Sequence, residues 1–146
     1  MVRTRVLIVD DDELVAQATG RRLKARSDVT TCSSVREARA LIAEGRRFDV
    51  ILSDVEMPGA DGFDLHAALR ESHPDQAERV LFMTGADPAG PVGRRLAAAG
   101  FMWLTKPFST AEVDEAFLTV IARLGPARPS SARLRAAPQR PSSPEA

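Results

Sequence analysis

The chain has 146 residues, 44% of them hydrophobic, and its 20 basic and 20 acidic side chains cancel. That length suits one domain with a substantial core and is short for two domains. No apolar run approaches the roughly 20 residues of a membrane span, and acidic residues follow the N-terminus too soon for a secretory signal, so we expect a cytoplasmic protein without membrane contact.

Short apolar runs alternate with helical patterns along most of the chain. The apolar runs predict strands over residues 5–10, 29–32, 50–54, 79–84 and 101–104. Helical spacing and two capping-box patterns predict helices over residues 12–26, 34–44, 63–72, 88–99 and 109–121. Such alternation indicates an α/β fold whose parallel sheet is covered on both faces and joined by right-handed crossovers.

Two segments depart from this regular pattern. The predicted helix 88–99 opens with two prolines and two glycines, so we expect it to be short and mobile. Residues 125–146 carry four arginines against one glutamate and hold half of the ten prolines. This composition predicts a disordered tail after a domain of residues 1–124. The tail has no aromatic residue or dense basic block, so we expect a solubilising tail or a remnant linker, without direct nucleic-acid binding.

Polar residues stand where several predicted strands end. They are Asp10, Asp11 and Asp12 after the first strand, Asp54 after the third, Thr84 after the fourth and Lys106 after the fifth. The carboxyl ends of parallel strands lie on one edge of the sheet, so these side chains should converge. Neighbouring carboxylates remain ionised together only around a cation, and oxygen ligands without cysteine or histidine suit Mg²⁺.

A magnesium ion, an ammonium and a hydroxyl around one aspartate would form a pocket for a phosphoryl group. Phosphoryl transfer needs charge neutralisation and in-line positioning, and Asp54 on the central strand is the natural carboxylate nucleophile. Each residue taken singly has an ordinary alternative: the acidic run can cap a helix, Lys106 can be a solvated charge and Thr84 can simply end a strand. The agreement of four strand ends favours the shared site.

The motifs VLIVDDDE, DVILSDVEMPGADG, VLFMTG and FMWLTKPF occur in this order within residues 3–124. In these motifs the chain resembles the receiver domain of two-component response regulators, the CheY-like family. The resemblance implies a flavodoxin-like, doubly wound sheet of five parallel strands, (βα)5. It implies a phosphoacceptor that is not an enzyme in the usual sense, although it slowly loses its own phosphate.

The resemblance also assigns roles to individual residues. It implies the metal-binding acidic pair at Asp11 and Asp12, the phosphoacceptor at Asp54, a metal-binding backbone carbonyl at Glu56, the switch hydroxyl at Thr84, the lysine at Lys106, an aromatic switch at Trp103 and a cis peptide before Pro107. The expected cofactor is Mg²⁺. Tryptophan is larger than the aromatic residue usual at its position, and a partly exposed indole that merely covers the sheet edge is the alternative there.

The implied partners are a sensor histidine kinase or a histidine phosphotransfer protein, and an unidentified downstream protein that reads the surface near the fourth helix and fifth strand. The chain is expected to be a monomer or a weak, phosphorylation-dependent dimer, and either a stand-alone regulator or the receiver of a hybrid kinase. Two other functions stay open. One is a haloacid-dehalogenase-like phosphohydrolase with Asp10 as nucleophile and Asp12 as its acid partner, and the other is a binding module that works without phosphate.

Overall fold

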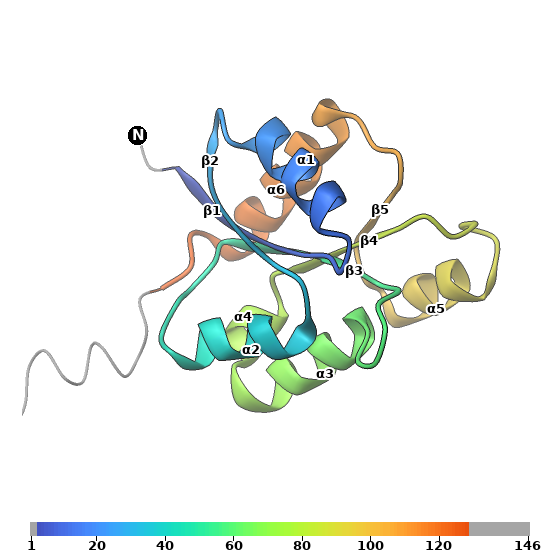
Figure 1. Ribbon diagram of the computed structural model, residues 1–146, viewed down its shortest axis with the longest axis horizontal. Helices are drawn as coiled ribbons and strands as arrows, with labels where there is room; N and C mark the ends of the chain where they lie inside the picture. Colours follow the sequence, from blue (N-terminus) through green and yellow to red (C-terminus); the bar gives the residue numbers. More distant parts are fainter. Residues whose placement is uncertain (1–2, 129–146) are drawn as a thin grey trace, which may run out of the picture.

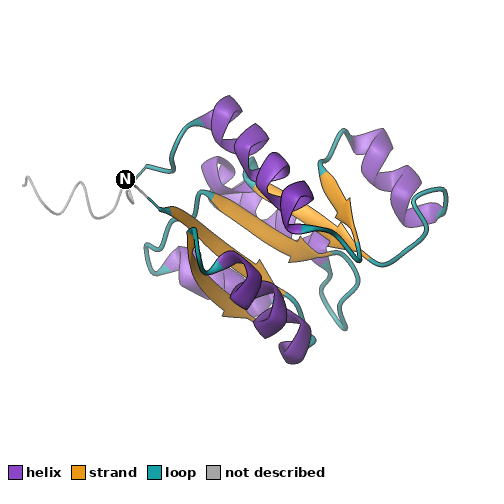
Figure 2. Cartoon of the chain, turned by 90° about the horizontal axis from the view of Figure 1, so that it is seen from above, coloured by secondary structure: helices purple, strands orange, loops and turns teal. Residues whose placement is uncertain are grey.

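The computed structural model describes residues 3–128, which form a parallel sheet between two layers of helices (Figures 1 and 2). The strands are β1 (Thr4–Val9), β2 (Ser27–Cys32), β3 (Val50–Asp54), β4 (Val80–Thr84) and β5 (Trp103–Thr105). Their order in the sheet is β2-β1-β3-β4-β5, and every neighbouring pair is parallel. This is the flavodoxin-like topology, and the predicted fold class is confirmed.

The helices are α1 (Glu13–Leu23), α2 (Val35–Ala43), α3 (Gly62–Ser72), α4 (Pro74–Ala77), α5 (Pro91–Ala99) and α6 (Thr110–Leu124). Helices α1 and α6 cover one face of the sheet, and the other helices lie on the opposite side (Figure 1). The central strands β3 and β4 are buried at every residue because helices cover both of their faces. Their side chains therefore alternate between two cores, with Ile51 and Phe82 in one and Leu52 and Leu81 in the other.

Several details differ from the prediction, among them the bounds of three elements. Helix α4 is a single turn that begins at Pro74, where the sequence indicated only the end of the preceding helix. Strand β5 covers Trp103–Thr105 and so starts two residues later than expected. Helix α5 begins at Pro91, since a loop hydrogen-bonded through the Asp87 carbonyl and the Gly90 amide precedes it.

The start of α5 packs closely on the loop before it, and Gly93 permits this contact. A Cβ added at Gly93 would overlap the carbonyl oxygen of Pro88, whereas a Cβ at Gly85 would meet nothing within 4 Å. We therefore expect Gly93→Ala to lower the free energy of unfolding by about 2 kcal/mol, the usual cost of overpacking. Gly85→Ala should change it by less than about 0.5 kcal/mol. Urea unfolding of both variants measures these changes. Equal free energies of unfolding for the two variants would show that the loop at Pro88 moves to accommodate the methyl group at little cost.

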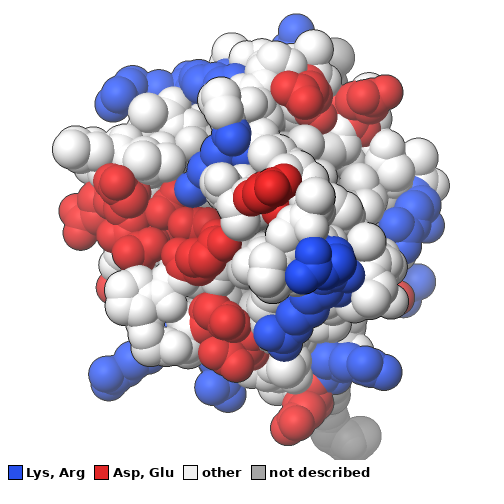
Figure 3. All heavy atoms as spheres, turned by 90° about the vertical axis from the view of Figure 1, so that its right-hand side faces the viewer, with Lys and Arg blue, Asp and Glu red and all other residues white. Residues whose placement is uncertain are grey.

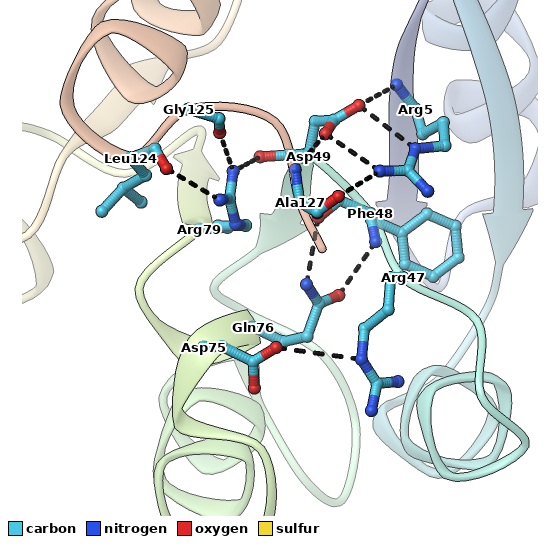
Figure 4. Close-up of polar contacts among 10 residues, drawn as sticks. All are labelled: Arg5, Arg47, Phe48, Asp49, Asp75, Gln76, Arg79, Leu124, Gly125 and Ala127. Atoms are coloured by element: carbon cyan, nitrogen blue, oxygen red, sulfur yellow. Dashed lines mark hydrogen bonds and ion pairs between the residues drawn. The ribbon is translucent and has the colours of Figure 1, made fainter. Parts of the chain in front are cut away.

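At the amino edge of the sheet a buried polar network holds the end of α6 (Figure 4). Asp49, 3% exposed, accepts hydrogen bonds from the backbone and side chain of Arg5 and from the Ala127 amide at 2.7 Å. The guanidinium of Arg79, which is also buried, donates to the carbonyls of Asp49, Leu124 and Gly125. A cation is favourable there because the last carbonyls of a helix lack partners and carry partial negative charge.

A second part of this network ties α4 to the same edge. Gln76 is fully buried, and its side-chain amide exchanges hydrogen bonds with the backbone N–H and carbonyl of Phe48 at 3.0 and 3.1 Å. Gly125 and Ala127, in the first residues of the predicted tail, contact the domain through the hydrogen bonds to Arg79 and Asp49. The rest of the predicted tail, residues 129–146, lies outside the described residues.

Between residues 3 and 128 no helix is both long enough and apolar enough to span a bilayer.

Candidate functional site

The sheet order reverses between β1 and β3, and ligands of doubly wound folds bind at such a reversal, beyond the carboxyl ends of the strands. Asp10 and Asp11 follow β1, and Asp54 ends β3. These three carboxylates offer oxygens that all lie within 4.8 Å of one another. Figure 3 looks onto this edge and shows acidic side chains gathered in one patch of the surface.

Lys106, just beyond β5, joins this acidic cluster. Its Nζ lies 3.3 Å from an Asp10 oxygen and 3.4 Å from an Asp54 oxygen. Partial burial acts to lower the pKa of Lys106, but the carboxylates of Asp54 and Asp10 outweigh burial and raise it. The ammonium is therefore firmly charged and can attract an anionic oxygen.

The environment of the cluster disfavours the ionised form of Asp54. Burial, assisted by the carboxylates of Asp10 and Glu56, raises the pKa of Asp54 to about 6, although Lys106 opposes the rise. One ammonium does not neutralise three carboxylates. The donors fit a hard divalent cation, since all are oxygens, and exposed Asp11 leaves one side open for water, several molecules of which Mg²⁺ retains.

Of the predicted metal pair, Asp11 lies in the acidic cluster and Asp12 does not. Asp12 is the N-cap of α1, and its Oδ1 accepts hydrogen bonds from the amides of Leu14 and Val15 at 3.1 and 3.2 Å. Asp10 takes its place in the cluster, 1% exposed and bonded to the Asp12 amide at 3.0 Å. The reason is local: the run of three aspartates spans the end of the strand and the start of the helix, and the last of them satisfies the first turn.

This placement predicts different effects of neutral substitutions on Mg²⁺ binding. Asp10→Asn and Asp11→Asn should each weaken Mg²⁺ binding by about tenfold or more, because each removes a charged oxygen from the cluster. Asp12→Asn should leave the affinity within about twofold, since asparagine is an equally good N-cap. Calorimetric Mg²⁺ titration measures all three. An equal loss in the Asp12 variant would restore the original pair.

Thr84 ends β4 beside this cluster and is 1% exposed. Its hydroxyl donates to the Glu56 carboxylate, with Oγ1 at 2.8 and 3.1 Å from the two oxygens, and accepts a hydrogen bond from the Ala86 amide at 3.0 Å. Nothing in the sequence pattern indicated this contact. The metal-binding role predicted for Glu56 concerns its backbone carbonyl, whereas its side chain reaches Thr84 on the neighbouring strand.

The loop after Asp54 folds back onto its own strand. The Gly62 amide donates to the Val55 carbonyl at 2.9 Å, and a Cβ at Gly62 would overlap the Asp54 carbonyl oxygen. The absence of a side chain at Gly62 therefore lets α3 start directly against the strand end. Gly62 thus packs against the backbone of Asp54 and Val55, a role that the turn-forming sequence around it only suggested.

The remaining predicted residues lie on or next to β5. Trp103 is half-buried, pairs in register with Phe82 and packs against the core that contains Leu96. The peptide between Lys106 and Pro107 is cis, and the Lys106 amide donates to the Thr84 carbonyl at 2.8 Å. The structure thus brings Asp10, Asp11, Asp54, Thr84 and Lys106 to one edge, with Asp12 turned to its helix.

The chain is similar to several known proteins in sequence and fold. The response regulator protein PilR of Pseudomonas aeruginosa is 31% identical over 130 residues, which cover 86% of this chain and 28% of PilR. The chemotaxis protein CheY4 of Vibrio cholerae superposes with a TM-score of 0.69 at 32% identity, covering 82% of this chain and 99% of that one. A structure of adenylate cyclase from Rhodopirellula baltica gives a TM-score of 0.73 at 30% identity, covering 84% and 90%.

The first curated relatives are much longer proteins, of which this chain spans only 10–28%. The model of the response regulator receiver domain matches residues 6–118, which include every residue of the acidic cluster as well as Thr84 and Lys106. The chain therefore belongs to the response regulator receiver domain family.

Proposed function

We propose that the protein is a phosphoacceptor in a two-component phosphorelay and that Asp54 receives the phosphoryl group. The carrying observation is the placement of Asp54 within 3.4 Å of the Lys106 ammonium and beside the oxygens of Asp10 and Asp11. Family membership adds the donor class, a sensor histidine kinase or a histidine phosphotransfer protein, which would place the chain in the cytoplasm.

The proposed transfer is a displacement at phosphorus. An Asp54 carboxylate oxygen forms a bond to phosphorus while the bond from phosphorus to the donor's imidazole nitrogen breaks, and that nitrogen leaves with the electron pair and takes a proton from water. The product is an acyl phosphate. The Lys106 ammonium binds a phosphoryl oxygen and neutralises part of its charge. The bond is later lost by hydrolysis, which makes the chain a signalling module more than an enzyme.

Asp10, Asp11 and Asp54 would hold Mg²⁺, with the backbone carbonyl of Glu56 as a further ligand. Bound Mg²⁺ would supply the remaining positive charge that the phosphoryl oxygens require. Asp10 is a poor nucleophile by comparison, since its carboxylate is 1% exposed and hydrogen-bonded to both Lys106 and the Asp12 amide. That burial argues against the phosphohydrolase alternative.

Phosphorylation would then change the surface formed by β5 and by α5, which is the fourth of the predicted helices. An unidentified partner protein would bind this surface. Trp103 on β5 would change its position as Thr84 moves toward the phosphate. The chain has one tryptophan, so its fluorescence reports on this residue alone. We expect the emission to change when beryllofluoride and Mg²⁺ are added, and an unchanged spectrum with binding confirmed by NMR would leave Trp103 with a purely structural role.

The test of the proposed function is to incubate the protein with acetyl phosphate and Mg²⁺, reduce the acyl phosphate with borohydride and map the modified residue by mass spectrometry. In the reaction with acetyl phosphate, an Asp54 carboxylate oxygen forms a bond to phosphorus while the bond from phosphorus to acetate breaks. Modification at Asp54, prevented by EDTA, is the expected result. Modification at Asp10 would support the phosphohydrolase, and the absence of any modification would support a module that works without phosphate.

A further inference from the structure

The side chain of Glu56 accepts the hydrogen bond of the Thr84 hydroxyl, which the proposed function needs for the phosphoryl group. Thr84 Oγ1 lies 2.8 Å from one Glu56 oxygen and 3.1 Å from the other. It also accepts a hydrogen bond from the Ala86 amide at 3.0 Å. A hydroxyl can donate only one hydrogen bond, and here the Glu56 carboxylate accepts it. Thr84 is 1% exposed, so water offers little competition for this bond.

The same hydroxyl cannot bind Glu56 and a phosphoryl oxygen on Asp54 at once. A charged acceptor makes its hydrogen bond stronger than a neutral one, so this contact holds Thr84 where it is. Glu56 lies two residues after Asp54 and carries the same sign of charge as a phosphoryl group. A phosphoryl group on Asp54 would therefore repel Glu56 while offering Thr84 new charged acceptors.

We propose that Glu56 is a positioning residue that holds the Thr84 hydroxyl away from Asp54 until phosphorylation displaces it. This inference rests on the proposed function and adds to it the contact that must break. Glu56 itself is exposed, so its carboxylate is free to turn into solvent when Thr84 leaves. The hydroxyl then donates to a phosphoryl oxygen, one hydrogen bond replacing another.

The first test needs no phosphate. Three-bond NMR couplings to the Thr84 methyl carbon report the χ1 rotamer of Thr84 in the unmodified protein. We expect one rotamer in the wild type and in Glu56→Gln, which keeps an acceptor oxygen at the same reach. Rotamer averaging is expected in Glu56→Asp, which keeps the charge but is one methylene too short. A fixed Thr84 rotamer in Glu56→Asp would overturn the proposal.

The second test measures the affinity for beryllofluoride with Mg²⁺. Glu56→Asp should bind about fivefold more tightly than the wild type, because the hydroxyl no longer has to be released. If Glu56 acts only through its charge, Glu56→Asp would match the wild type and only Glu56→Gln would bind more tightly. Glu13→Gln, at the start of α1, is the control for loss of a rim charge without contact to Thr84.

The contact itself is isolated by a double-mutant cycle with Thr84→Val, which lacks the hydroxyl. In that background Glu56→Asp should change the beryllofluoride affinity by less than about twofold. A gain as large as in the wild-type background would contradict the proposal. If the wild type fails to bind beryllofluoride at all, the proposed function fails, while the rotamer measurement still decides whether Glu56 holds Thr84.

Discussion

Replacing Asp54 by asparagine is expected to abolish phosphorylation by acetyl phosphate, a loss of at least about a thousandfold in rate. An amide has no ionised oxygen to attack phosphorus, and its nitrogen lone pair is delocalised. Intact-mass spectra taken over time with Mg²⁺ present measure the rate. Asp12→Asn is the matched control, because the same chemical change at the cap of α1 should leave the rate unchanged.

The Asp54→Asn variant should also fold well, which separates lost chemistry from lost structure. Burial and neighbouring carboxylates raise the pKa of Asp54 to about 6, so its ionised form is unfavourable in the folded state at neutral pH. Removing that charge should raise the free energy of unfolding at pH 7 by roughly 1–2 kcal/mol. Excess Mg²⁺, the proposed cofactor, should stabilise the wild type by binding and so narrow this difference. Phosphorylation of a folded Asp54→Asn variant at the wild-type rate would place the phosphoacceptor elsewhere.

Replacing Asp49 by alanine is expected to lower the free energy of unfolding by about 3 kcal/mol at pH 7. The carboxylate is 3% exposed, and its loss would leave the amides of Arg5 and Ala127 without their acceptor. Urea unfolding followed by circular dichroism measures the change. Asp75→Ala is the control, since its ion pair with Arg47 is a long 3.8 Å contact with a carboxylate that is 61% exposed. That variant should lose less than about 1 kcal/mol.

The contribution of Asp49 should depend on pH. Burial acts to raise the pKa of Asp49, but hydrogen bonds from Ala127 and Arg5 and the charge of Arg5 outweigh burial and lower it. A carboxylate with a lowered folded-state pKa stabilises the fold fully above its unfolded value, near 4, and loses that effect as pH falls through the folded value. The stability gap between wild type and Asp49→Asn should therefore be constant from pH 7 to about 5 and shrink below about 4. A gap that widens in acid would mean that the carboxylate is protonated in the folded protein.

Much of the fold could be predicted because the central strands are continuous apolar runs flanked by turn residues and helical patterns. The errors arise where the signal is short or local. Helix α4 has only four residues, too few for periodicity, and its burial depends on the side chain of Gln76 meeting a distant backbone at Phe48. The three residues of β5 are set by pairing with β4, which no local pattern encodes.

The candidate site was predictable to the level of the sheet edge, since a parallel sheet fixes where its strands end. Assignment within the run of three aspartates was not, because all three suit a metal and only the backbone decides that Asp12 caps α1. The bond between Glu56 and Thr84 joins residues 28 apart on neighbouring strands. It depends on a side-chain rotamer, and residue spacing alone does not determine that.

Strands β3 and β4 connect the polar network that anchors α6, at one edge of the sheet, with the candidate functional site at the other edge. Asp49 and Arg79 precede them at the edge that anchors α6, and Asp54 and Thr84 end them at the edge that holds the proposed chemistry, five residues further along in both cases. A strand rises about 3.3 Å per residue, which separates the two edges by roughly 16 Å, a distance at which substitutions without shared partners have nearly additive effects. Substitutions at one edge can therefore change the stability of the fold almost independently of the proposed phosphorylation at the other edge.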